Sequence, residues 1–315
     1  MSFQLIPPDV DIDFVGKRHF FVGLSSLINI AAIVLLLTVG LNYGVDFVGG
    51  SIVQLQFAHT TDGGRIRKAM RPLGLGEVKV QEFGAAYRHQ YLVRFEKVKD
   101  IGGLGRELET QLVKTYKPGE VKVLRVETVG AKVGHDLRLD GIEAVVFATI
   151  FMGCFIAWQF RNVSWSFGAG AVIALIHDVL VVTGALVISR LEFDLTTLAA
   201  LLTVIGYSVH DTIIVSDRIR EDAAKRRREP IATIMNRAIN ETLSRTILTS
   251  GTAIAVLIAL LALGGPILRP PAFTLLVGFI TGTYSSIYIA GPVVLFWEGK
   301  GRGAKGKRAM TTRAA

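Results

Sequence analysis

The sequence predicts an α-helical integral membrane protein with six transmembrane helices and one α+β domain outside the membrane. Three observations support this fold class: six long apolar stretches, a low share of charged residues, and one long polar segment, 42–141, between the first two stretches. Half of the 315 residues are hydrophobic, 19% are charged and the mean hydropathy is +0.46. A soluble protein of this length needs more polar surface, so a soluble protein with buried helices is the disfavoured alternative.

Each apolar stretch can cross a bilayer, which takes roughly 20 helical residues. The first, at 20–41, is too long for the apolar region of a signal peptide and no Ala-x-Ala site follows it, so we expect a retained anchor. The other five form a bundle over 142–297; the shortest of them has Glu143 at its start. The six stretches are Phe20–Leu41, Ala144–Phe160, Trp165–Ser189, Leu195–Val215, Thr246–Gly264 and Ala272–Trp297.

Basic residues predict the orientation of the chain. The N-terminal segment 1–19, the loop 216–245 and the tail 298–315 are basic, whereas the short loops after the third and fifth stretches carry only Arg190 and Arg269 as basic residues. Loops rich in Lys and Arg stay in the cytoplasm, so we expect both termini there. This topology, with contact to anionic lipid, accounts for the basic runs, and nucleic-acid binding is not expected.

The segment 42–141 is long enough to be a domain, and its pattern predicts the order β-α-β-β-α-β. Ser51–Phe57 alternates between apolar and polar residues, as a half-buried strand does. The order is the split βαβ, ferredoxin-like pattern, whose sheet can offer an open face or edge to an extended chain; a passive spacer is the alternative. The other expected elements are a helix from Asp62 to about Leu73, strands at Val78–Phe83 and Tyr91–Phe95, a helix at Asp100–Tyr116 and a strand at Val121–Glu127.

Two of the apolar stretches carry a His-Asp pair. His177-Asp178 lies midway along the third stretch, and His210-Asp211 lies near the end of the fourth. A charge at the centre of a membrane helix costs about 2.5–3.5 kcal/mol, so such residues usually handle ions, protons or substrate. Arg245, at the start of the fifth stretch, can reach Asp211 if the two helices are adjacent. Desolvation raises the pKa of a buried acid and a nearby cation lowers it, so a change in this balance makes the acid take up or release a proton, as coupling to a proton gradient requires. The candidates for proton coupling are therefore Asp211, Arg245, Asp178 and His210.

Structural alternatives exist for each of these candidates. Arg237, Glu241 and Arg245 recur at four-residue steps and can form an ion-pair ladder on a helix surface. Asp211 lies about one helical turn from the end of its stretch and can be interfacial. Asp178 lies deeper, and a neutral side chain hydrogen-bonded to a neighbouring helix would explain it without any role in proton transfer.

Two further patterns concern the packing of the helices. Pro230 is expected to open a separate amphipathic helix on the membrane surface, before the fifth stretch begins. Small residues at four-residue spacing favour close helix packing, which predicts one packing stripe on each of the last two stretches. The stripes are Gly278, Gly282, Ser286 and Ala290 on the sixth, and Gly251, Ala255 and Ala259 on the fifth.

Enzyme motifs are absent from the sequence. It contains no His-Glu-x-x-His zinc site, no Gly-x-Ser-x-Gly elbow and no P-loop, so we expect neither an enzyme nor a metal or other cofactor. The single cysteine, Cys154, excludes an intrachain disulfide.

Four motifs resemble those of the SecF family of bacterial protein-export subunits. Residues 44–50 resemble its Gly-x-Asp-Phe-x-Gly-Gly motif, and residues 129–134 its Val-Gly-Pro-x-Val-Gly junction. Residues 211–221 and 244–251 resemble two further signatures, and the pair at 177–178 also occurs in the family. The motif residues with an expected structural role are Gly44, Asp46, Phe47, Gly49, Gly50, Gly130, Gly134, Asp217, Arg218, Arg220 and Glu221.

The resemblance implies a subunit with a fold akin to the RND transporters that uses the proton motive force to assist late steps of protein translocation across the bacterial inner membrane. It implies SecD, the SecYEG channel and an unfolded translocating polypeptide as partners, with the outside domain holding the polypeptide. It assigns the intramembrane acid to Asp211 and its basic partner to Arg245. Two other functions stay open: half of an RND-type small-molecule or lipid exporter, and a scaffold without proton coupling.

Three positions depart from the family pattern. His210 replaces a common asparagine, which adds a titratable group beside Asp211 and can change the pH range of coupling. Ser216 replaces a frequent phenylalanine, and Ala131 replaces the usual proline at the junction between domain and membrane. The last two changes affect local packing and flexibility rather than the chemistry.

Overall fold

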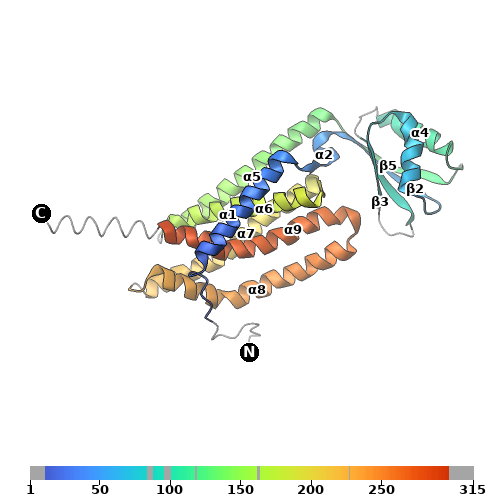
Figure 1. The fold of residues 1–315 in the computed structure, drawn as a ribbon. Helices are drawn as coiled ribbons and strands as arrows, with labels where there is room; N and C mark the ends of the chain where they lie inside the picture. Colours follow the sequence, from blue (N-terminus) through green and yellow to red (C-terminus); the bar gives the residue numbers. More distant parts are fainter. Residues whose placement is uncertain are drawn as a thin grey trace.

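The computed structural model describes residues 11–83, 88–95, 101–117, 119–161, 164–226 and 228–297, with only the backbone for 101–106. The basic tail expected at 298–315 lies outside the described residues. Figure 1 shows two parts: a bundle of long helices, and a smaller α+β domain at one end of it, beside α2.

The described residues contain six helices that are long and apolar enough to cross a membrane, as predicted. Each contains most of one predicted stretch, but several extend further, because a helix need not end where its apolar residues do. The α5 helix, for example, begins before Ala144, in a polar segment. The helices are α1 (Arg18–Thr38), α5 (Ala131–Gln159), α6 (Ser166–Ser189), α7 (Leu195–Lys225), α8 (Ile231–Leu263) and α9 (Gly265–Ser285), which continues through a π-helical turn (Ser286–Ala290) to Trp297.

The expected separate surface helix after Pro230 is not found. Pro230 is the N-cap of α8, which runs without a break through Arg245. Ile234 and Met235, in the segment expected to form this surface helix, are buried in the main core of the bundle. The α7 helix likewise continues to Lys225, so the basic segment 216–245 consists of two helix ends and a short connection instead of a loop. The ends of α7 and α8 pack together in the core of the bundle, whereas contact with the membrane surface was predicted.

The smaller domain has the predicted order of strands and helices. Its elements are β2 (Gly50–Phe57), α3 (Gly63–Met70), a short 3₁₀ helix (Arg71–Leu73), β3 (Val78–Phe83), β4 (Gln90–Phe95), α4 (Ile101–Val113) and β5 (Val121–Val129). All neighbouring strands are antiparallel, in the order β3-β4-β2-β5. Asp62 is the N-cap of α3, although its side chain makes no capping hydrogen bond.

One face of this sheet is covered and the other is open. Val53 and Leu55 of β2 are fully buried in a core with Ile66 of α3 and Leu112 of α4, so the two helices cover that face. The alternate β2 residues point the other way because side chains alternate along a strand. Gln54, one of them, is only partly buried. The alternating pattern therefore predicted correctly which residues enter the core.

Three short elements that the sequence did not predict join the domain to the bundle. β1 (Asn42–Tyr43), which follows α1, pairs in parallel with β6 (Glu192–Phe193), which connects α6 to α7. Next comes α2 (Val45–Val48), whose Phe47 is buried and lies parallel to Phe193 at a ring-centroid distance of 5.5 Å. Strands of two residues leave no periodic signal in a sequence, so only the fold shows this pairing.

Candidate functional site

The Asp211 side chain lies inside the bundle, where α7 faces α8 and α9. Its relative exposure is 1%, and its Oδ2 atom has no hydrogen-bond partner among the described residues. The hydroxyl of Thr283, on α9, is the hydrogen-bonding group next to this carboxyl. A buried acid with an oxygen left unpartnered responds readily to a change in its surroundings, as a proton-exchanging group must.

A chain of hydroxyl groups leads to Asp211 across three helices. Tyr207 of α7 donates to the Ser250 hydroxyl of α8 over 2.9 Å, and Ser250 is 2.8 Å from the Thr283 hydroxyl of α9. The Tyr207 ring is stacked on Phe279 with a centroid distance of 3.7 Å, which fixes the start of the chain. Tyr207 lies four residues before Asp211 on the fourth apolar stretch. Ser250 and Thr283 were missed because they come from other helices, and their hydroxyls within apolar stretches were the available signal.

Asp178 is as deeply buried as Asp211 but is fully engaged. Its Oδ2 accepts hydrogen bonds from Ser208 of α7 (2.6 Å) and Ser285 of α9 (2.8 Å), and its Oδ1 lies 3.0 Å from Nδ1 of His177. The relative exposure of Asp178 is 1%. Asp178 of α6 is therefore hydrogen-bonded to α7, which carries Asp211, and to α9, which packs beside it. Neither serine was singled out from the sequence.

The structure does not bring Arg245 into contact with Asp211. Among the described residues neither makes an ion pair with the other, and Arg245 is exposed on α8. The alternative ladder does not form either, since Glu241 pairs with Arg218 and Arg237 pairs with Glu229. His210 is exposed on the surface of α7.

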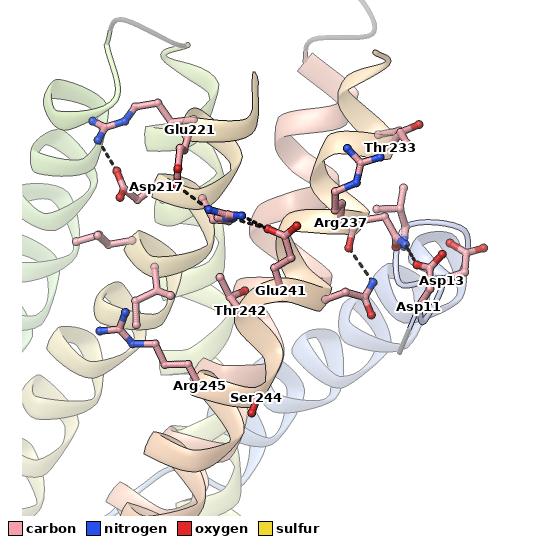
Figure 2. Close-up of a pocket in the computed structure, with 18 of the residues that line it drawn as sticks. Asp11, Asp13, Asp217, Glu221, Thr233, Arg237, Glu241, Thr242, Ser244 and Arg245 are labelled. Atoms are coloured by element: carbon pink, nitrogen blue, oxygen red, sulfur yellow. Dashed lines mark hydrogen bonds and ion pairs between the residues drawn. The ribbon is translucent and has the colours of Figure 1, made fainter. Parts of the chain in front are cut away.

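Arg245 instead lines a cavity of about 1350 Å³ between α7, α8 and the N-terminal segment 11–16. Figure 2 shows its side chain reaching from α8 toward α7, with no interaction drawn to it. Ile214 also lines the cavity, so this space comes within one turn of α7 of the buried acid at position 211. The cavity thus connects the unpaired guanidinium with the region of Asp211.

The polar motif at the end of α7 forms the wall of the same cavity. Arg218 donates to Glu221 over 2.7 Å and pairs with Glu241 of α8, while Arg220 pairs with Asp217 (Figure 2). The pair between Arg218 and Glu241 joins the ends of α7 and α8, and the other two pairs lie within α7. Ion pairs at the end of α7 therefore include all four family-motif residues of this segment, Asp217, Arg218, Arg220 and Glu221.

The N-terminal segment closes one side of the cavity through two asparagines of α8. Asn236 accepts hydrogen bonds from the backbone amides of Phe14 (2.9 Å) and Val15 (3.2 Å). Asn240, one turn further on, accepts from the amide of Ile12 (2.9 Å). Phe14 is buried in the main core of the bundle. These residues were also missed, because amide side chains give no periodic signal.

The glycine motifs form the junction between domain and bundle. Gly49 and Gly50 have φ of +82° and +141°, which side chains disfavour, and a Cβ on Gly134 of α5 would lie 2.9 Å from the Gly49 nitrogen. Asp46 accepts a hydrogen bond from the Leu195 amide (3.1 Å) at the start of α7. The remaining motif glycines serve the same junction: Gly44 donates to the Phe193 carbonyl (2.9 Å), and Gly130 is the N-cap of α5.

One ion pair also crosses this junction. Arg94 of β4 pairs with Glu192 of β6, both largely buried. Burial lowers the pKa of the Arg94 guanidinium, while the nearby carboxylates of Asp194 and Asp46 oppose that shift. The domain is therefore attached to the bundle by paired charges as well as by backbone.

No group of three or more His, Cys, Asp or Glu side chains that could hold a metal ion is found among the described residues. The region around Asp211 offers hydroxyls and one carboxyl, which can exchange and relay protons.

The chain matches two described sequence families. "Protein export membrane protein SecD/SecF, C-terminal" matches residues 108–300, and "SecD/SecF GG Motif" matches residues 34–61. Protein translocase subunit SecF of Desulfurispirillum indicum is 40% identical over 91% of this chain and 92% of its own length. The corresponding subunit of Escherichia coli O157:H7 is 37% identical over 90% of this chain and 87% of its own length.

Two solved structures are also similar. SecDF from Thermus thermophilus, described as a translocon-associated membrane protein, has a TM-score of 0.79 and 34% identity over 94% of this chain. SecDF in a super-membrane-facing form has a TM-score of 0.73 and 33% identity over 98% of this chain. The chain spans 40% and 41% of the length of these two proteins.

Proposed function

The chain belongs to the SecF family of protein translocase subunits, and we propose that it uses the proton motive force to assist a late step of protein export across a bacterial inner membrane. The observation that carries the coupling step is the Asp211 side chain, buried in the bundle with one carboxyl oxygen unpartnered. One elementary charge that crosses 100 mV releases about 2.3 kcal/mol, which is enough to shift a two-state helix arrangement.

Helix movement and proton binding would be coupled through Arg245. In this structure Arg245 lies in the cavity and makes no contact with Asp211. A second arrangement that brings the two together would change the proton affinity of the acid, since an acid responds strongly to a cation within about 4–6 Å. The hydroxyls of Tyr207, Ser250 and Thr283 would then pass the proton along, and His210 would set the pH range.

The basic residues and the SecDF likeness support a proposal for topology and partners. Both termini would lie in the cytoplasm, and 42–141 would lie outside the membrane as a ferredoxin-like domain. Its open sheet face, with Gln54, would hold an unfolded polypeptide leaving the SecYEG channel. The chain covers about two-fifths of SecDF, so a SecD subunit would supply the remainder of the machine. Membrane lipid would contact the exposed apolar faces of the bundle. The exporter alternative has no observation in its favour.

The test is pulse-chase export of a secreted precursor in cells depleted of their own SecF and supplied with this chain and the SecD of the same source. Asp211→Asn is compared with the parent at matched membrane levels. Asp136→Asn, which removes an exposed carboxylate of α5, is the matched control.

Rescue by the parent and the control, but not by Asp211→Asn, supports the proposal. Equal rescue by all three proteins would contradict proton coupling through Asp211 and would leave a scaffold. No rescue by the parent would contradict the role in export itself.

A further inference from the structure

The hydrogen bonds of Asp178 end beside the groups that surround Asp211. Ser208 lies one turn before Asp211 on α7, and the Thr212 hydroxyl donates back to the Ser208 carbonyl over 3.0 Å. On α9, Ser285 follows the Asp211 neighbour Thr283 by two residues. Both serines donate to the same oxygen of Asp178. Asp178 therefore determines the relative position of the two helix segments that face each other at Asp211.

Contact between α7 and α9 is close enough to transmit a small displacement. A Cβ on Gly282 would lie 3.2 Å from the Ser208 Cβ, so no side chain separates the two backbones there. One turn away, the Val204 side chain packs directly against Gly278 and fills the space that a Cβ there would need. Close-packed helices move as units because nothing between them can be compressed. A shift of Ser208 or Ser285 would therefore reach Thr283 and change what Asp211 contacts.

The environment of Asp178 favours a fixed group over one that exchanges a proton. Its carboxyl is engaged by Ser208, Ser285 and the Nδ1 atom of His177, and donation by all three is the arrangement that an ionised carboxylate accepts. A proton on Nδ1 leaves Nε2 of His177 as an acceptor, and that atom is buried without a partner among the described residues. The Tyr284 ring, 5.9 Å away, covers the imidazole. Both oxygens of Asp178 thus have hydrogen-bond partners, whereas one oxygen of Asp211 has none among the described residues.

We propose that Asp178 is a positioning residue for the coupling acid: through Ser208 and Ser285 it holds α7 and α9 so that Thr283 and the hydroxyl chain face Asp211. This inference builds on the proposed function, since it assumes that Asp211 is the group that couples. It predicts that Ser208 and Ser285, which have no ionisable carboxyl, matter for coupling as well.

The experiment compares side chains that preserve or remove the hydrogen bonds of Asp178. In Asp178→Asn the amide still accepts from one serine and donates to the other, so the helices stay in place without the charge. Asp178→Ala, Ser208→Ala and Ser285→Ala each remove bonds. Ser189→Ala is the control, because this hydroxyl bonds only to the carbonyl of Leu186 in its own helix. All variants are expressed with SecD and compared at matched membrane levels with Asp211→Asn.

Two quantities are measured: the rate of precursor export and its dependence on pH. We expect Asp178→Asn to stay within about threefold of the parent, and Asp178→Ala to lose about tenfold, the equivalent of one or two buried hydrogen bonds. The serine variants should lie between them.

The groups that face Asp211 and could shape the pH profile are Tyr207 and His210 on α7, Ser250 on α8 and Thr283 on α9, with Arg245 in the cavity. The pH of half-maximal export should move by about half a unit or more in Ser285→Ala and Asp178→Ala, but not in Ser189→Ala.

Three outcomes would overturn the inference or its premise, and they can be told apart. Complete loss in Asp178→Asn, equal to Asp211→Asn, would make Asp178 a proton carrier. Losses that follow only the membrane level, with an unchanged pH profile, would reduce Asp178 to a folding role. Normal export by Asp211→Asn would contradict the proposed function itself, whatever the Asp178 variants do.

Discussion

The acids of the two His-Asp pairs, Asp178 and Asp211, have the same exposure and different surroundings. Each is 1% exposed, yet Asp178 is bonded by two serines and a histidine whereas Asp211 keeps an unpartnered oxygen. Burial alone therefore does not distinguish the two acids. Their hydrogen bonds do, because satisfied groups are held in place and unsatisfied ones respond to movement.

The largest expected effect comes from removing the charge of Asp211. Asp211→Asn keeps the size of the side chain but cannot exchange a proton, so export that depends on the proton motive force should fall at least about tenfold. Export into inverted membrane vesicles, measured with and without an uncoupler, checks this. Equal sensitivity of the variant and the parent to the uncoupler would contradict the proposal that Asp211, unlike Asp178, exchanges the proton.

Apolar substitutions sharpen the comparison through stability. Asp178→Leu leaves the buried Ser208 hydroxyl without its acceptor and Ser285 with only the Gly282 carbonyl among the described residues, which we expect to cost about 2–4 kcal/mol. Asp211→Leu removes one oxygen that has no partner and one beside Thr283, whose hydroxyl keeps Ser250 as a partner, so the free energy of unfolding should change less. Thermal unfolding of the detergent-solubilised protein with its SecD partner measures both. Equal destabilisation by the two changes would contradict the difference in their hydrogen bonds.

A smaller effect on folding, with a clear effect on export, is expected at Arg245. Arg245→Ala removes a guanidinium that makes no ion pair here, so the melting temperature should change by no more than about 1–2 °C. Arg218→Ala is the matched comparison, because Arg218 pairs with Glu221 and Glu241 and should lower stability more. Export should nevertheless fall several-fold in Arg245→Ala. Normal export by this variant would remove Arg245 from the coupling mechanism.

The smallest effect is expected at His210. His210 is exposed on α7, so His210→Asn should export within about twofold of the parent at neutral pH. Any part that the imidazole takes in coupling should appear as a difference between the two export profiles from about pH 5 to pH 8. Export rates measured across this pH range test the prediction. Parallel profiles would show that His210 has no part in coupling.

The sequence predicted the elements whose signals are local. Strand β3 lies at the predicted residues, and the alternation of Val53, Gln54 and Leu55 identified the buried face of the sheet. The stripe with Gly278 and Gly282 does pack closely, against α7, as predicted. The stripe with Gly251 lies exposed in this chain, since small residues permit packing but do not supply the neighbour.

The candidate site was predictable only in part. Acids within apolar stretches are costly and therefore conspicuous, which is how Asp178 and Asp211 were found. Serine and threonine are inexpensive in membrane helices, so Ser208, Ser285 and Thr283 gave no comparable signal. The missing contact between Arg245 and Asp211 also could not be read from spacing, because it depends on the rotation of α8 relative to α7.

By itself the sequence determined the class of the protein, its six apolar helices, the order of elements in the small domain and the acids worth testing. These properties depend on composition and short-range periodicity, which the chain carries residue by residue. Only the tertiary structure decided that α8 is one continuous helix, that an unpredicted strand pair joins domain to bundle, and that one acid is bonded while the other is free to respond. Those outcomes depend on which side chains meet across helices far apart in the chain, and no local pattern encodes such contacts.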